Sequence, residues 1–535
     1  MITGKLLAAA GAFGAPAGLA TWLVVQTMGT SAGVAPAEAA ASLPAEPGIE
    51  WFWAINGPVS ADAGSDFAID AEGNVFLAGS HGGLDLDHDG NVDLASGATA
   101  YKGARNPLFM KLGSDGPGQP MKIRWARSPA TPADRSDTRI AVDGRGGAFV
   151  TGAFMESLSF EGGPRLAGAG GNDAYLARYD ADGSVRWARV VGGPDGGDAI
   201  YGLASDADAN AYVLATGTGS FPLDGGGAFE APDRRAAALI SYSPEGAVRW
   251  VRVFGAGTPF AFGIAVAPSG QIFVTGELEG EADFDGDGKA DLPAPRDRDG
   301  YVARFDRAGK FLGAWTTPTP GSPRFGPNGD VFLGGVMGGP MDQRYGPPDF
   351  DGDGKADIRL RDEGPTGSWL ARYSPEGELR WVRSSTLERP SDFEVRSDIV
   401  ILAGSYKGVR DLDEDGKPEI RRDVVDSKLE TDMAVLIVSA DDGKPVRTWL
   451  APGPGNDVAS GIAFLPGRQA VLVTGSLQLT ADFTGDGEFG EGWIVCENLG
   501  DIFVAQYRLP ERPPERPREE RPREEPKREP RAPPR

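Results

Sequence analysis

Residues 264–315 read IAVAPSGQIFVTGELEGEADFDGDGKADLPAPRDRDGYVARFDRAGKFLGAW, and this stretch decides the fold. It contains four short apolar segments, at 264–266, 272–276, 301–305 and around Trp315. Each is rich in β-branched or aromatic residues and too short for a typical helix, so we predict four consecutive strands. Gly276 closes the second strand, and an aspartate-rich connection leads to the third.

The same unit recurs seven times at a spacing of roughly 60–70 residues, which is the period of a propeller blade with long loops. We therefore predict an all-β chain that forms a seven-bladed β-propeller of four-stranded antiparallel blades. The strands that end in glycine lie at 75–79, 149–152, 213–217, 272–276, 331–335, 400–404 and 471–475.

The two ends of the repeat predict how the ring closes. The seventh copy stops at Leu509 and has no tryptophan strand after it, whereas a spare one, Trp51–Ile55, precedes the first copy. We expect this strand to pair beside Tyr507 at the outer edge of the last blade, because closure removes an exposed sheet edge.

One tryptophan recurs at the same place in the fourth strand of most copies, often between arginines. We interpret it as packing between neighbouring blades rather than as a stacking platform for a ligand. These residues are Trp125, Trp187, Trp250, Trp315, Trp381 and Trp449.

Composition excludes several kinds of chemistry. The chain of 535 residues has 2 His and 1 Cys, too few for a histidine-rich metal cluster or a thiolate zinc site, and its net charge of -24 disfavours nucleic acid. Both histidines, His81 and His88, fall in the first copy, and we expect His81 to lie in a surface loop. Cys496 is either buried and inert or pairs between chains.

The segments outside the repeat suggest export. Residues 1–41 resemble a signal peptide, with Lys5 before an apolar stretch and small residues after it, although an uncleaved membrane anchor is the alternative. A linker at 42–49 leads to the propeller at 50–509. The Pro/Arg/Glu-rich segment 510–535 has nothing apolar to bury, so we predict a disordered tail.

Four copies carry the pattern D-x-D-x-D-G-x-x-[DE] between the second and third strands. Carboxylates at positions 1, 3 and 5 converge only if the chain wraps around a cation; position 7 offers a carbonyl and position 9 an acid, a hard-oxygen set that selects Ca²⁺. The predicted ligands are Asp85, Asp87, Asp89, Asn91 and Asp93; Asp283, Asp285, Asp287, Lys289 and Asp291; Asp349, Asp351, Asp353, Lys355 and Asp357; and Asp411, Asp413, Asp415, Lys417 and Glu419.

Three details limit this interpretation. The loops are not EF-hands, because position 12 never offers a glutamate, and polar turns without metal are the alternative. A degraded copy at 482–487 lacks the acid at position 9, and the second and third copies have too few ligands. In an up-and-down propeller, the four loops should lie on one face.

The repeat resembles the bacterial SBBP-type seven-bladed β-propeller proteins in its Gly-Asn-Val-Phe-Leu-Ala-Gly strand (73–79), its Tyr-Val-Ala-Arg-Phe strand (301–305) and its Trp-Ala-Arg strand (125–127). Its aspartate loops resemble those of dockerins, thrombospondin type 3 repeats and FG-GAP blades. The resemblance covers about residues 50–509 and implies export to the envelope or outside, with binding roles.

Three functions follow as hypotheses. The first is a monomeric, calcium-stabilised binding or scaffold protein that takes a protein or glycan partner. The second is a propeller enzyme, a lyase or hydrolase, although no nucleophile–base–acid trio is legible. The third is an architectural surface module tethered by its tail.

Overall fold

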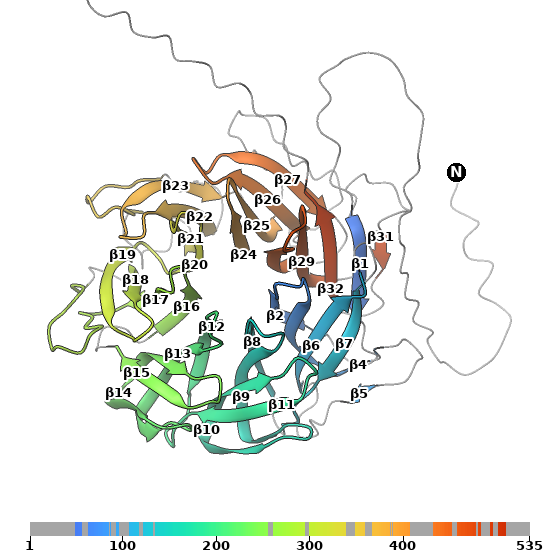
Figure 1. The fold of residues 1–535 in the computed structure, drawn as a ribbon. Helices are drawn as coiled ribbons and strands as arrows, with labels where there is room; N and C mark the ends of the chain where they lie inside the picture. The colour runs from blue at the N-terminus through green and yellow to red at the C-terminus, as the bar shows by residue number, and fades with distance from the viewer. Residues whose placement is uncertain are drawn as a thin grey trace, which may run out of the picture.

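The chain forms a ring of blades around a central axis, as the computed structural model shows (Figure 1). The structure describes residues 49–509 except 56–62, 85, 87–92, 96–105, 117–120, 132–133, 255–259, 295–298, 339–347, 359–365, 386, 388, 407–431, 452–456, 478–479, 483–492 and 496–500. Within this part there is no helix long and apolar enough to span a membrane. The expected signal segment, most of the linker and the tail lie outside the described residues.

Seven four-stranded antiparallel sheets make up the ring, which confirms the predicted fold class. From the axis outward, blade 1 contains β2 (Ala63–Ile69), β3 (Val75–His81), β6 (Asn106–Ser114) and β7 (Met121–Arg127); blade 2 β8 (Asp134–Val142), β9 (Ala148–Ser159), β10 (Arg165–Tyr179) and β11 (Val185–Val191); blade 3 β12 (Ala199–Ser205), β13 (Ala211–Pro222), β14 (Ala228–Tyr242) and β15 (Val248–Val253).

The other four blades repeat this order. Blade 4 contains β16 (Phe260–Val266), β17 (Ile272–Leu278), β18 (Asp299–Phe305) and β19 (Phe311–Thr317); blade 5 β20 (Gly321–Phe325), β21 (Val331–Gly338), β22 (Thr366–Tyr373) and β23 (Leu379–Ser385); blade 6 β24 (Arg389–Arg396), β25 (Ile399–Tyr406), β26 (Asp432–Ser439) and β27 (Pro445–Ala451); blade 7 β28 (Val458–Phe464), β29 (Ala470–Leu477) and β32 (Asp501–Arg508). Two small hairpins, β4 (Gly83–Leu84) with β5 (Leu94–Ala95) and β30 (Thr480–Asp482) with β31 (Trp493–Val495), lie in loops.

The N-terminal strand closes the ring as predicted. β1 (Ile49–Ile55) is the fourth strand of blade 7 and runs antiparallel to β32. Ile49 lies opposite Tyr507 and Trp53 opposite Val504. The last blade is therefore built from both ends of the repeat, so no blade is left with three strands.

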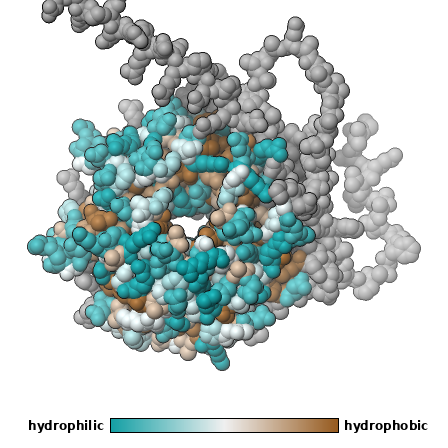
Figure 2. Space-filling model, in the orientation of Figure 1, coloured by the Kyte–Doolittle hydropathy of each residue, from teal (hydrophilic) through white to brown (hydrophobic). Residues whose placement is uncertain are grey.

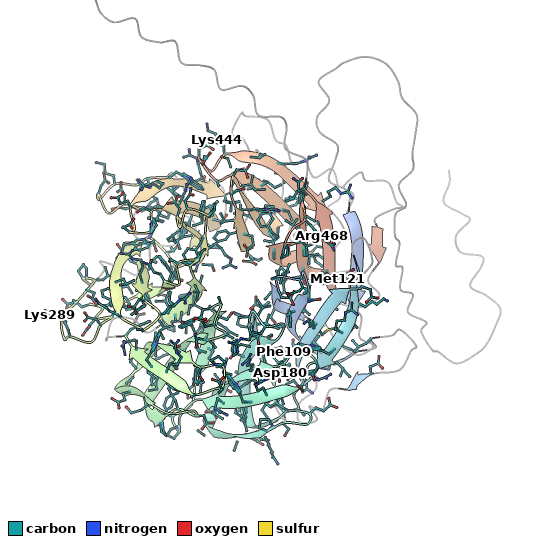
Figure 3. The ribbon with its side chains drawn as sticks, in the orientation of Figure 1. Phe109, Met121, Asp180, Lys289, Lys444 and Arg468 are labelled. Carbon is teal, nitrogen blue, oxygen red and sulfur yellow. The ribbon has the colours of Figure 1, made fainter. Side chains whose placement is uncertain are left out.

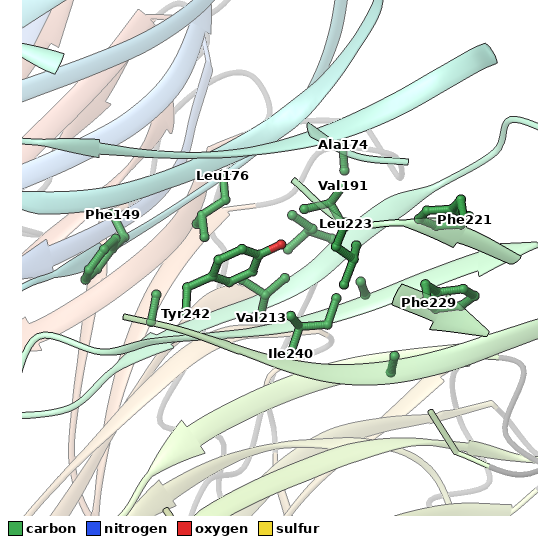
Figure 4. Packing of buried hydrophobic residues seen from close by; sticks show 14 of the residues in the cluster. Phe149, Ala174, Leu176, Val191, Val213, Phe221, Leu223, Phe229, Ile240 and Tyr242 are labelled. Atoms are coloured by element: carbon green, nitrogen blue, oxygen red, sulfur yellow. The ribbon is translucent and has the colours of Figure 1, made fainter. Parts of the chain in front are cut away.

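The cores lie between blades rather than within one sheet. Every residue of β3 and of β17 is buried, because each middle strand is covered on both faces by neighbouring sheets. One apolar cluster joins blades 2 and 3, where Leu176 and Tyr242 lie close together (Figure 4). Ring integrity thus depends on contacts repeated at every seam between blades.

The recurring tryptophans join neighbouring blades, as predicted. Trp125 Nε1 donates to the carbonyl of Ala181 at 3.1 Å, and Arg127 Nε donates to the carbonyl of Gly183 at 2.8 Å, both in the next blade. Gly183 has φ of 79°, and a Cβ there would lie 2.6 Å from Trp125. The turn therefore requires glycine, both for its backbone and for the indole.

Candidate metal centres

Two of the four predicted calcium loops lie within the described residues, and they occupy equivalent places. One connects β17 to β18 in blade 4 and the other connects β21 to β22 in blade 5. Because each blade alternates strand direction in the same order, both loops emerge on the same face of the ring. Figure 3 shows Lys289 of the blade 4 loop at the outer margin of the ring, away from the axis.

The first three aspartates converge in both loops. One carboxylate oxygen from each of Asp283, Asp285 and Asp287 lies within 4.8 Å of the other two, and Asp349, Asp351 and Asp353 form the same arrangement. In each trio the first carboxylate is partly buried and the other two are exposed. Three like charges at this separation repel one another, and a cation among them relieves that repulsion.

The backbone wraps around the first carboxylate. In blade 4, Gly286 N donates to Asp283 Oδ1 at 2.6 Å and Gly288 N donates to Asp283 Oδ2 at 2.9 Å. Gly286 and Gly288 have φ of 78° and 84°, values in the left-handed region that favours glycine. In blade 5 the equivalent bonds to Asp349 measure 2.7 and 2.8 Å.

The acid at position 9 closes the loop onto its second residue. Asp291 Oδ2 accepts from Phe284 N at 2.7 Å, and Asp357 Oδ2 accepts from Phe350 N at 2.6 Å. Burial raises the pKa of Asp291, and the nearby Asp285 and Asp283 raise it further. The sequence predicted this acid as a ligand, and the structure gives one of its oxygens to the backbone.

The predicted calcium loop of blade 1, at residues 85–93, is described only in part. Asp93 Oδ2 accepts from Leu86 N at 2.7 Å, which repeats the closure of the other two loops. The remaining predicted ligands Asp85, Asp87, Asp89 and Asn91 lie outside the described residues, as do Asp411, Asp413, Asp415, Lys417, Glu419, most of the degraded copy at 482–487, and Cys496.

The lysine at position 7 has a role that sequence reasoning missed. It was predicted to supply a carbonyl, but its side chain also approaches the third carboxylate. Lys289 Nζ donates to Asp287 Oδ2 at 3.2 Å, and Lys355 Nζ donates to Asp353 Oδ2 at 2.8 Å. Hydrogen bonds from Lys289 lower the pKa of Asp287, so the ammonium acts as an exposed counter-ion.

An aromatic anchor beneath each loop was also missed. Phe284 is 1% exposed, with ring centroids 5.2 Å from Tyr301 and 5.3 Å from Phe254. Phe350 is likewise buried and packs 4.9 Å from Trp369. The sequence feature that could have indicated this anchor is the apolar residue at position 2 of each loop, between the first two aspartates. These anchors hold the loops against the blades independently of any cation.

His81 differs from its prediction. It lies fully buried at the end of β3, opposite Asn106, rather than in a surface loop. Its Nε2 is 2.7 Å from Ser128 Oγ, and burial lowers its pKa to about 4. The imidazole is therefore neutral at physiological pH.

A second group of charged residues lies on the innermost strands, around the opening that Figure 2 shows at the axis. Arg324 Nη2 lies 2.5 Å from Asp392 Oδ1, and Arg324 Nε lies 3.4 Å from Glu394 Oε1. Asp392 Oδ2 also accepts from Ile462 N of the next blade at 3.2 Å. This carboxylate thus joins neighbouring inner strands.

Comparison with known proteins found only distant structural similarities. No family model matches the chain, and no curated protein matches it. The structure is similar to a europium-containing methanol dehydrogenase (10% identity, covering 86% of this chain and 93% of that one, TM-score 0.39). It is also similar to a PL25 ulvan lyase (10%, 79% and 93%, TM-score 0.37) and a quinohemoprotein alcohol dehydrogenase from Pseudomonas putida HK5 (12%, 88% and 78%, TM-score 0.35). Similarity this low says nothing about activity.

Proposed function

We propose that this chain is an exported, calcium-stabilised propeller that acts as a binding or scaffold protein for a protein or glycan partner. The observation that carries the calcium part of the proposal is the convergence of three carboxylates in the same way in two loops. Carboxylate and carbonyl oxygens are the ligands that Ca²⁺ prefers, and the loops at 283–291 and 349–357 contain neither histidine nor cysteine.

In this proposal the cation replaces the lysine as counter-ion. Asp283, Asp285 and Asp287 supply carboxylate oxygens, and the exposed ammonium of Lys289 swings into solvent. Loops that are already wrapped and anchored lose little entropy on binding. With millimolar external calcium and a dissociation constant of about 10⁻⁴ M, each site contributes about 1.4 kcal/mol to the free energy of unfolding. Such sites suit permanent stabilisation outside the cell.

A chelator experiment tests the metal. We expect EDTA to lower the Tm of the chain and added Ca²⁺ to restore it, with a smaller response in the double variant Asp283→Asn/Asp349→Asn. The exposed substitution Glu161→Gln in blade 2 is the matched control and should respond like the parent chain. An unchanged Tm in saturating EDTA would refute bound calcium.

The binding role needs its own experiment, because the calcium loops do not identify a partner. A glycan array and a pull-down, each performed with and without Ca²⁺, should detect a ligand whose capture weakens when the loop face is altered. N-terminal sequencing of secreted protein tests the export part; a mature chain beginning at Met1 contradicts signal cleavage.

A hydrolase is the second candidate function, favoured by the contact between His81 Nε2 and Ser128 Oγ. A neutral imidazole within hydrogen-bond distance of the hydroxyl of a partly exposed serine provides the base and the nucleophile, although His81 Nδ1 has no hydrogen-bond partner in the described part of the chain to orient the ring. Labelling of Ser128 by a fluorophosphonate, abolished in His81→Gln, would support it. Absence of labelling in the folded parent chain would leave the binding role.

A further inference from the structure

Two buried aspartates lie on the two sides of the seam between blades 2 and 3. Asp173 lies in β10, and Asp198 immediately precedes β12 in the next blade. They are 0% and 3% exposed, and the backbone N of Asp198 donates to the carbonyl of Asn172 at 3.2 Å. Both side chains are therefore buried, and this backbone hydrogen bond joins their two segments across the seam.

Backbone amides donate hydrogen bonds to one oxygen of each carboxylate. Asp173 Oδ2 accepts from Ala169 N at 2.8 Å, and Asp198 Oδ2 accepts from Gly193 N at 2.8 Å. The other oxygen, Oδ1 of each, is buried and has no hydrogen-bond partner in the described part of the chain. Neither carboxylate forms an ion pair with a described lysine or arginine. The guanidinium of Arg235 lies over the Phe260 ring, 5.3 Å from its centroid, and its charge lowers the pKa of Asp198 against the larger effect of burial, which raises it.

Both carboxylates lie against one glycine pair. A Cβ on Gly192 would come within 2.2 Å of Asp173 Oδ1, while the next residue, Gly193, donates to Asp198. A Cβ on Gly217 would lie 2.8 Å from Asp198 Oδ1. Removing two anions from water costs several kcal/mol when no ion pair compensates for the lost hydration. Two carboxylate oxygens without hydrogen-bond partners thus lie beside glycines that contribute no side chain.

We propose that the seam between blades 2 and 3 binds one Ca²⁺ between Asp173 and Asp198, with carbonyl or water oxygens completing its shell. The site is separate from the aspartate loops, which blades 2 and 3 lack. It gives that part of the ring a cation site of its own, placed between blades instead of within one.

The sequence repeats this pair of positions at two other seams. Asp432 begins β26 and Asp457 immediately precedes β28, between blades 6 and 7; Asp501 begins β32 and Asp62 immediately precedes β2 in the sequence, between blades 7 and 1. Asp457 is buried like Asp198, whereas the side chains of the other three lie outside the described residues. Three of seven seams thus carry two acids where the others carry at most one.

Calcium counting in a loop-free background tests the proposal separately from the proposed function. The chain Asp85→Asn/Asp283→Asn/Asp349→Asn/Asp411→Asn loses the first ligand of each of the four predicted calcium loops. By equilibrium dialysis, we expect it to retain bound Ca²⁺ and to lose one ion per chain when Asp198→Asn is added. Asp195→Asn, at an exposed residue of the same connection, should lose none. No calcium on the loop-free chain, or no loss with Asp198→Asn, would overturn the seam site while leaving the loop sites intact.

Stability measurements guard against a variant that fails to fold. The neutral amide introduced by Asp198→Asn cannot repel Asp173, yet its oxygen still accepts from Gly193 N. We therefore expect Asp198→Asn to match or exceed the parent Tm in EDTA and to fall below it in Ca²⁺. A Tm lowered equally in both conditions would mean a structural role only and would contradict the proposal.

Discussion

The connection between the second and third strands of a blade takes two forms. Blades 2 and 3 have one form, and blades 4 and 5 have the other. In blade 2 the chain turns through a tight glycine hairpin, in which Phe160 N donates to the carbonyl of Pro164 at 3.2 Å. In blade 4 the chain makes a longer loop whose amides donate to Asp283 and Asp291. Both begin with a buried aromatic residue, Phe160 or Phe284. The fold thus requires the anchor, whereas the carboxylates are an addition to some blades.

The first prediction removes the buried aromatic residue that both connections share, and it has the largest expected effect on stability. Phe284→Ala and Phe160→Ala should each lower the free energy of unfolding by about 3–5 kcal/mol, because each leaves a cavity beneath its connection. Phe262→Ala is the control, since Phe262 is 49% exposed and should cost little. Denaturant unfolding measures all three. A large loss for Phe284 and none for Phe160 would show that the anchor belongs to the aspartate loops alone.

The second prediction concerns the pH dependence of stability that buried His81 causes in blade 1. His81 occupies in blade 1 the register position that Phe154 occupies in blade 2. Burial lowers the His81 pKa to about 4, so the unfolded chain takes up a proton first as pH falls below 6.5. This residue should therefore cost about 2 kcal/mol of stability between pH 8 and pH 5.

The variant His81→Phe copies blade 2 and isolates that effect. Its stability should fall less than that of the parent chain over the same pH interval, and His81→Gln serves if the phenyl ring does not fit. Parallel pH profiles for parent and variants would contradict a buried neutral imidazole.

The sequence predicted the ring and its closure because these depend on repetition, which seven copies make visible. It misplaced His81 because Gly-Ser-His-Gly reads as a loop, whereas its pairing with Asn106 depends on a residue 25 positions away. The anchors escaped notice because Phe284 sits between acids that suggested a solvated loop. The Asp173–Asp198 pair escaped because it forms only across a seam, and no local pattern brings two blades together.

The third prediction separates the two kinds of connection by calcium. Asp283→Asn should remove about 1.4 kcal/mol of calcium-dependent stabilisation at millimolar Ca²⁺. Glu161→Gln in the blade 2 hairpin should remove none, because that turn closes through its own backbone. Thermal melts in Ca²⁺ and in EDTA measure the difference. An equal response of both variants would show that the aspartate loops are metal-free turns of another kind.

The smallest effect concerns the lysine inside the loop. Lys289 is 84% exposed at its side chain and bonds to Asp287, so Lys289→Ala should leave the Tm in EDTA unchanged. Its ammonium competes with a bound cation, so its removal should raise calcium affinity about two- to fivefold at low salt and less at high salt. Titration calorimetry at two ionic strengths measures this change, with Lys310→Ala outside the loop as control. Weaker calcium binding by Lys289→Ala would mean that the side chain supports the loop instead of neutralising it.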